Sequence, residues 1–101
     1  MILIQNFITF ILIIRLTSAT LSYCSSQNTG SQLVNSSIYQ SNGLCHDKCN
    51  QEGFALAIVQ YQDCWCSNYV PGNTVDVDEC NMNCPGFPSE KCGGDDLYGY
   101  I

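Results

Sequence analysis

The sequence predicts a small disulfide-rich α+β domain, in which disulfides fix one helix to a short antiparallel sheet. Three observations favour this fold class. Eight cysteines follow an apolar amino terminus, a predicted helix contains two of these cysteines, and a predicted hairpin contains two more. An even number of cysteines in a short secreted chain is typical of a disulfide framework, because a core this small is marginal by itself. The cysteines are Cys24, Cys45, Cys49, Cys64, Cys66, Cys80, Cys84 and Cys92.

The amino terminus has the pattern of a secretory signal peptide. Residues 2–14 are almost entirely apolar, and residues 16–19 end in small side chains that suit signal peptidase. This apolar run is shorter than the about 20 residues that a membrane-spanning helix needs. The one cationic side chain, Arg15, follows the run instead of preceding it, which leaves an uncleaved anchor as the alternative. We expect residues 1–19 to be a signal peptide and residues 20–101 to be one domain.

The mature chain is expected to be strongly acidic. It has Lys48 and Lys91 against nine acidic residues, and therefore a net charge of −7. Such a surface does not hold nucleic acid or anionic lipid through phosphate contacts. The CxxxC and CxC spacings do not favour a metal site, since zinc sites usually use CxxC pairs or add histidines, and His46 is the single histidine. We expect no nucleic-acid partner, no metal and no cofactor.

The first part of the mature chain predicts a short strand and then a surface loop. Residues 21–24 are expected to form an entering strand. Residues 25–37 are rich in Ser, Asn and Gln, a composition typical of loops. This stretch contains the sequon Asn35-Ser36-Ser37, so Asn35 is a candidate N-glycosylation site.

A helix is predicted over residues 44–52, with Ser41 as a candidate N-cap and Gly53 as the residue that ends it. Cys45 and Cys49 stand four residues apart, so both project from one helical face. Their Cβ vectors run parallel, and we therefore expect them to bridge to a neighbouring element and not to each other.

That element is expected to be a hairpin. Residues 54–60 are an apolar strand run, residues 61–63 a turn, and Cys64-Trp65-Cys66 the return strand. The two cysteines share one face of that strand and Trp65 takes the other. Two helical thiols thus meet two strand thiols, which clamps the helix to the sheet.

The remaining chain predicts mostly loop, closed by a strand over residues 97–101. Its carboxylates lack the ligand spacing and the glycine of an EF-hand loop, which favours a solvated acidic face over calcium binding. These residues are Asp76, Asp78, Glu79, Asp95 and Asp96.

Four short motifs give the chain a resemblance to a known family. They are Cys45-x-x-x-Cys49 followed by Gly53-Phe54, then Cys64-Trp65-Cys66, Cys80-x-x-x-Cys84, and Glu90-Lys91-Cys92-Gly93-Gly94 before Tyr98. With these motifs the chain resembles the WSC domain of yeast-type fungal cell-wall integrity and stress-response sensors, from Tyr23 to about Tyr100. The resemblance implies a PAN/apple-like module. It also implies the pairs Cys24–Cys80, Cys45–Cys64, Cys49–Cys66 and Cys84–Cys92, of which the two middle ones agree with the clamp.

The resemblance further implies a non-enzymatic extracellular module that engages cell-wall polysaccharide, β-glucan or a related polymer, as the ectodomain of a wall-stress sensor. Such sensors continue into a mannosylated stalk, a transmembrane helix and a cytoplasmic tail. We therefore expect a secreted or cell-wall location, and the plasma membrane if this chain is a fragment of a full sensor. Aromatic faces would stack on sugar rings and amides would bond hydroxyls. The candidates are Tyr61, Trp65, Tyr69, Phe87, Asn68 and Asn73.

Other interpretations remain open at the level of sequence. Trp65 lies on a strand tied down on both sides, which favours a packing role, whereas the other three aromatic candidates lie in turn-like segments. The same aromatics could serve protein binding or self-association, and a free secreted cystine-rich effector is a third reading. Catalysis has little support, because the sequence offers no nucleophile–His–carboxylate set.

Overall fold

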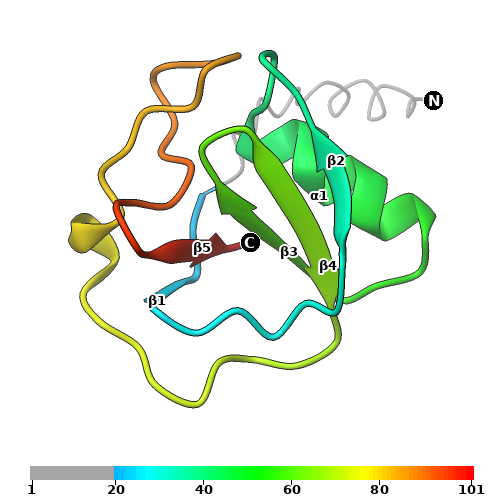
Figure 1. Cartoon of the computed structure of the whole chain (residues 1–101), viewed down its shortest axis with the longest axis horizontal. Helices are drawn as coiled ribbons and strands as arrows, with labels where there is room; N and C mark the ends of the chain where they lie inside the picture. Colours follow the sequence, from blue (N-terminus) through cyan, green and yellow to red (C-terminus); the bar gives the residue numbers. More distant parts are fainter. Residues whose placement is uncertain (1–19) are drawn as a thin grey trace, which may run out of the picture.

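The computed structural model describes residues 20–101, so the predicted signal peptide lies outside the described residues. The strands form one antiparallel sheet in the order β1-β5-β3-β4-β2, and the helix α1 packs on β3 and β4 (Figure 1). The predicted α+β class, with one helix on an antiparallel sheet, is confirmed. The elements are β1 (Tyr23–Ser25), β2 (Leu33–Ser36), α1 (Asn42–Gln51), β3 (Leu56–Gln60), β4 (Asp63–Ser67), the 3-10 helix η2 (Val77–Glu79) and β5 (Tyr98–Tyr100). None of the helices in residues 20–101 has the length and apolar character that a membrane span requires.

The helix begins at the predicted cap. Ser41 has extended backbone angles, and its hydroxyl accepts a hydrogen bond from the backbone N–H of Leu44 at 3.0 Å. At the other end Gly53 adopts a φ of 86°, in the left-handed region that glycine tolerates best. These local signals fix the length of α1, and they place Cys45 and Cys49 on its buried side.

Two disulfides join this buried side to the hairpin. Cys45 bonds Cys64 and Cys49 bonds Cys66, with Cα–Cα distances of 5.6 and 5.3 Å. Both hairpin cysteines are buried and face α1, as the alternation along β4 predicts. The core between helix and sheet consists of Cys45, Cys49, Ala57, Val59, Cys64, Cys66, Cys84 and Cys92.

The opposite face of the sheet is covered by irregular chain. Ile58 and Tyr100 are fully buried there, and the Tyr100 hydroxyl donates to the Gln27 carbonyl at 2.6 Å. Trp65 packs edge-on against Tyr98 with ring centroids 5.4 Å apart. A Cβ added at Gly30 would lie 2.7 Å from the Trp65 Cβ, so the chain passes directly over this side chain. Trp65 is therefore half-buried between loop and sheet.

Two further disulfides close the loops outside the clamp. Cys24–Cys80 ties β1 to the end of η2, and Cys84–Cys92 closes a loop of the carboxy-terminal part. All four bridges are the pairs that the family resemblance implies, and the described residues contain no free cysteine.

The structure explains the Glu-Lys-Cys-Gly-Gly motif by packing. A Glu90 carboxylate oxygen accepts a hydrogen bond from the backbone N–H of Asn42 at 3.1 Å, in the first turn of α1, where negative charge is favourable. Gly93 has a φ of 71°, and a Cβ there would lie 2.7 Å from the carbonyl oxygens of Val59 and Leu97. The motif thus fixes the loop that ends at β5 to both the helix and the sheet.

The predicted loop over residues 25–37 is wrong in its last part. Residues Leu33–Ser36 form β2, which pairs with β4 at the sheet edge through an irregular register between Leu33 and Asn35. An edge strand needs only one partner and one covered face, so a four-residue strand with two polar residues can form there. The entering strand is Tyr23–Ser25, a shift from the predicted residues 21–24. In the acidic run, the Asp76 carboxylate accepts from the N–H of Asp78 and caps η2, which was predicted as loop.

The loop that carries Phe87 rests on the turn that carries Tyr39. The Gly86 N–H donates to the Gln40 carbonyl at 2.8 Å. A Cβ at Gly86 would lie only 1.9 Å from the Tyr39 carbonyl oxygen, so no other residue fits there without a shift of the backbone.

We expect the loss of stability on removing a disulfide to follow the length of the loop that it closes. The double variant Cys24→Ala/Cys80→Ala should lose about 4 kcal/mol and Cys84→Ala/Cys92→Ala about 2.5 kcal/mol, since these bridges span 56 and 8 residues. All four cysteine side chains are at most 1% exposed. The cavities that the Cys→Ala substitutions leave are therefore similar in the two double variants. Denaturant unfolding measures both values, and an equal or reversed order would contradict this entropic account.

Gly86→Ala is expected to destabilise the domain, because the added methyl group collides with the Tyr39 backbone. Gly43→Ala is the matched control: its Cβ would meet only the Ser41 hydroxyl oxygen at 3.9 Å, and alanine in a helix is favoured over glycine by about 0.5–1 kcal/mol. Thermal unfolding should show a lower Tm for the first variant and an unchanged or higher Tm for the second. A Gly86→Ala protein as stable as the Gly43→Ala protein would refute the close contact.

Candidate functional site

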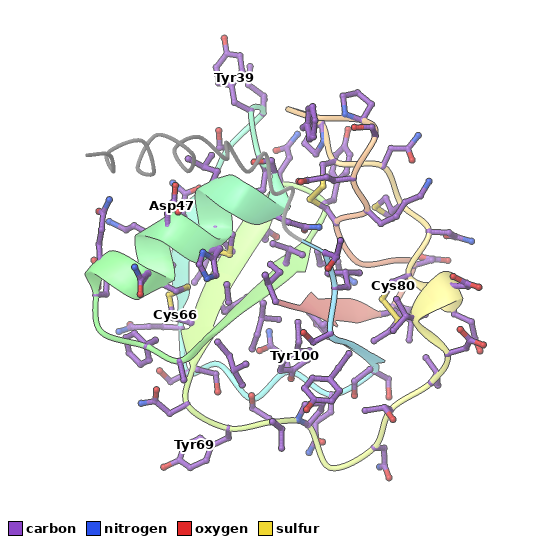
Figure 2. The ribbon with its side chains drawn as sticks, turned by 180° about the vertical axis from the view of Figure 1, so that it is seen from behind. Tyr39, Asp47, Cys66, Tyr69, Cys80 and Tyr100 are labelled. Carbon is purple, nitrogen blue, oxygen red and sulfur yellow. A yellow bond between two sulfur atoms is a disulfide. The ribbon has the colours of Figure 1, made fainter. Side chains whose placement is uncertain are left out.

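The exposed aromatic side chains of the described residues lie at different ends of the domain. Tyr39 and Tyr69 are 73% and 72% exposed, and Figure 2 shows them at opposite ends. Phe87, 47% exposed, belongs to the Tyr39 end through the Gly86 contact. Tyr61, 45% exposed, lies in the turn between β3 and β4, at the far end of β4 from Tyr69. Tyr69 is thus separated from the other two loop aromatics. The Gln62 carbonyl, next to Tyr61, accepts from the Ser37 N–H at 2.9 Å, so the Tyr61 turn adjoins the turn that carries Tyr39.

Tyr61 lines an open groove of about 390 Å³, which we call the Tyr61 groove. The turn after β3 and the loop before β5 supply most of its walls, and Met82 adds a thioether. Tyr61 and Asp96 are the two non-glycine residues with positive φ among the described residues, at 53° and 56°, and both line it. Its residues are Gln60, Tyr61, Gln62, Asp63, Met82, Gly94, Asp95 and Asp96.

Hydrogen bonds fix the walls of this groove. The Tyr61 N–H donates to the Cys92 carbonyl at 2.8 Å, which anchors the turn to the Cys84–Cys92 loop. The Gln60 amide donates to the Gly94 carbonyl at 3.2 Å, across the groove's floor. Because both segments are held by backbone contacts and a disulfide, the Tyr61 side chain is presented from a rigid base.

The polar groups of the groove are mainly acceptors. One Asp63 carboxylate oxygen accepts from the Ser36 hydroxyl at 2.8 Å. The carboxylates of Asp95 and Asp96 are exposed and have no hydrogen-bond or ion-pair partner within residues 20–101. An aromatic face beside free carboxylate oxygens can stack on a sugar ring and accept hydrogen bonds from its hydroxyls.

Two amide candidates lie away from this groove. Asn68 and Tyr69 follow β4 directly, and the Asn68 amide oxygen accepts from the Ala55 N–H at 3.0 Å. Asn73 is exposed, and its carbonyl accepts from the buried Ser25 hydroxyl at 2.6 Å. These hydrogen bonds hold loops in place, and neither residue lines the Tyr61 groove.

Sequence reasoning missed two parts of the surface. Ile38 and Tyr39 are 62% and 73% exposed, and the loop of the exposed Phe87 contacts their turn through Gly86. We call Ile38, Tyr39 and Phe87 the Tyr39 tip. The sequence signal for this surface is the presence of two large apolar residues inside a turn that is rich in Ser and Asn. Asp95 and Asp96 had been assigned to a general acidic face, because only the fold brings them to Tyr61.

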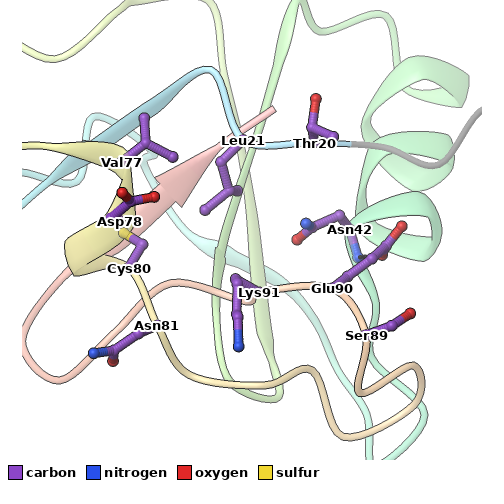
Figure 3. A pocket seen from close by; sticks show the side chains of 10 residues that line it. All are labelled: Thr20, Leu21, Asn42, Val77, Asp78, Cys80, Asn81, Ser89, Glu90 and Lys91. Carbon is purple, nitrogen blue, oxygen red and sulfur yellow. Dashed lines mark hydrogen bonds between the residues drawn. The ribbon is translucent and has the colours of Figure 1, made fainter.

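A second hollow of about 290 Å³ lies between η2 and the segment around Glu90 (Figure 3). No aromatic residue lines it, and two of its three charged side chains, Glu90 and Lys91, already bond Asn42 and Asn83. This hollow offers no stacking face for a sugar. Its residues are Thr20, Leu21, Asn42, Val77, Asp78, Cys80, Asn81, Ser89, Glu90 and Lys91.

Other clusters have structural explanations. The sulfur atoms of Cys45, Cys49 and Cys64 lie within 4.8 Å of one another because the two clamp disulfides are neighbours, and sulfur in a disulfide is no thiolate ligand. His46 and Asp47 form an exposed pair at 3.7 Å on the outer side of α1.

Asn35 is half-buried on β2, and its side-chain oxygen accepts from the Gln40 amide at 3.0 Å, so its glycosylation stays a prediction.

Comparisons with known proteins agree with the motifs. The model of the WSC domain matches residues 17–94. Cell wall integrity and stress response component 4 of Saccharomyces cerevisiae is 44% identical over 88 residues, which cover 85% of this chain and 14% of that protein. Component 3 of the same yeast is 36% identical over 72 residues, and protein SLG1 is 34% identical over 62, covering 67% and 59% of this chain and 13% and 16% of those proteins.

The chain thus spans less than a fifth of the length of these three relatives, and the part that they share is the disulfide-linked domain described above. The family model covers both clamp disulfides, the Cys84–Cys92 bridge and the Glu-Lys-Cys-Gly-Gly motif. The chain belongs to the WSC-domain family.

Proposed function

We propose that this domain is an extracellular, non-enzymatic module that engages fungal cell-wall polysaccharide, β-glucan or a related polymer, as the ectodomain of a cell-wall stress sensor. The observation that supports the proposal most is the Tyr61 groove, where an exposed aromatic lies beside carboxylate and amide groups on a rigid turn. The family membership and the names of the yeast relatives support the cell-wall assignment. The location that follows is the cell surface or the wall.

The proposed binding is non-covalent, and it neither forms nor breaks a covalent bond in the polysaccharide. The Tyr61 ring would stack on the apolar face of a pyranose, while Gln62 and the neighbouring carboxylates bond its hydroxyls. The domain is small and loop-rich, so ordering such a surface on binding would cost conformational entropy. The clamp and the Cys84–Cys92 bridge remove much of that freedom beforehand, which leaves more of the contact energy for binding.

A second function is favoured by the Tyr39 tip. Three large apolar side chains, Ile38, Tyr39 and Phe87, stand exposed where two loops meet. Exposed apolar groups of this kind commonly serve protein contacts, so the tip supports binding of a protein partner or self-association. This function uses the opposite end of the domain from Tyr69 and does not need the Tyr61 groove.

We expect Tyr61→Ala to weaken retention on insoluble β-glucan by about two- to tenfold, because one aromatic stacking contact contributes about 0.5–1.5 kcal/mol. Tyr69→Ala is the matched control: it removes an exposed tyrosine ring from the other end of β4. Both variants should keep the wild-type Tm, since neither ring is part of the core.

Pull-down with and without excess soluble glucan measures the effect. Loss of binding in Tyr69→Ala, with Tyr61→Ala unchanged, would move the contact to the other end of the domain. Loss of binding in Phe87→Ala alone would move it to the Tyr39 tip. A wild-type protein that binds no wall polysaccharide, yet forms reversible oligomers that Tyr39→Ala and Phe87→Ala abolish, would assign the domain to self-association instead.

A further inference from the structure

The Tyr61 groove has an uncompensated negative charge. Three of its eight lining residues, Asp63, Asp95 and Asp96, carry carboxylates, and none is Lys, Arg or His. A groove that binds a neutral polymer needs groups that donate hydrogen bonds to the sugar hydroxyls and accept hydrogen bonds from them. It does not need three negative charges close together. Like charges that gather at a surface repel one another unless a cation joins them.

The described part of the chain offers no cation for these carboxylates. Lys48 pairs with Glu52 along α1 at 3.3 Å, and the Lys91 ammonium donates to the Asn83 amide oxygen at 2.6 Å. His46 lies beside Asp47 on the outer side of the helix. Within residues 20–101 no cationic side chain lines the groove, so its carboxylates are open to solvent ions or to a cationic bound molecule.

We propose that the Tyr61 groove prefers sugars that carry a free amine, namely β-linked glucosamine units of a cationic polysaccharide. This inference rests on the proposed function and names the substrate class of the same groove. The Tyr61 ring supplies the stacking face that any pyranose needs. The carboxylates of Asp95 and Asp96, which are exposed and unpaired, can accept hydrogen bonds from a hydroxyl or an ammonium group, but only the ammonium adds the attraction between opposite full charges.

N-acetylation of the sugar removes the positive charge on which this preference depends. It turns the ammonium into a neutral amide and adds an acetyl group, so the attraction to the carboxylates is lost while the pyranose face remains. Glucosamine and N-acetylglucosamine oligomers of equal length therefore separate the charge contribution from the stacking contribution.

The experiment is a calorimetric titration of the folded domain with three soluble oligomers of equal length: β-1,4-glucosamine, β-1,4-N-acetylglucosamine and β-1,3-glucan. We expect the glucosamine oligomer to bind about four- to twenty-five-fold tighter than the other two, about two- to fivefold for each of two exposed charge pairs. This preference should shrink as salt is raised, since the Debye length falls from about 10 Å at 0.1 M to about 3 Å at 1 M. It should also shrink at a pH where the amines are neutral.

The double variant Asp95→Asn/Asp96→Asn should bind the glucosamine oligomer no better than the acetylated one, because both carboxylate charges are removed. Asparagine tolerates the positive φ at residue 96, so the turn is expected to remain folded. Asp47→Asn is the charge-matched control, because this exposed carboxylate lies on α1 outside the groove. It should leave the preference intact.

The possible outcomes separate the two proposals. Equal affinity for all three oligomers would overturn the amino-sugar preference and leave glucan binding standing. Glucosamine binding that Asp47→Asn weakens as much as the double variant would overturn it too, because general charge attraction would then explain the result. Calcium that binds alone and displaces no sugar would assign the carboxylates to a metal ion and overturn it. Binding of glucosamine alone, dependent on Asp95 and Asp96, would support this inference and refute the β-glucan assignment.

Discussion

The pair of disulfides between α1 and the β3–β4 hairpin is the constraint on which the rest of the structure depends. Helix α1 buries only Asn42, Cys45 and Cys49, and Leu44 is exposed. A helix with so narrow a buried face gains little from apolar packing. Cys45–Cys64 and Cys49–Cys66 therefore replace the apolar stripe that normally holds a helix on a sheet. Two bridges side by side also fix the direction of the helix, which a single bridge would leave free to swing.

The clamp has a direct consequence for the Tyr61 groove. Both bridges hold β4 against α1, and β3 and β4 are paired along their whole length up to the turn. The turn is tied in addition to the Cys92 carbonyl, inside the loop that Cys84–Cys92 closes. The groove thus lies between two segments that covalent bonds already hold in place. Rigid presentation of this kind suits a surface that must bind a flexible polymer chain.

Local sequence signals were enough to predict much of the fold. Ser41 and Gly53 mark the ends of α1, the apolar run and the Cys-Trp-Cys segment predict the hairpin, and the last five residues contain β5. The signals fail where a partner far along the chain decides the structure. β2 has only four residues, two of them polar, and it forms because β4 offers a free edge. The same holds for the groove and the Tyr39 tip: Tyr61 meets Asp95 and Asp96, and Tyr39 meets Gly86, only through the fold.

The central claim is that a disulfide-fixed scaffold presents a sugar-binding groove at the β3–β4 turn. NMR shift mapping of the isotope-labelled domain during titration with a soluble β-glucan oligomer tests it most directly, because it locates the contact without any substitution. We expect the shifts to concentrate on the residues around Tyr61, with Asp95 and Asp96 among them, and the signals of α1 to stay unchanged. Shifts confined to Tyr39 and Phe87, or to Tyr69, would contradict it.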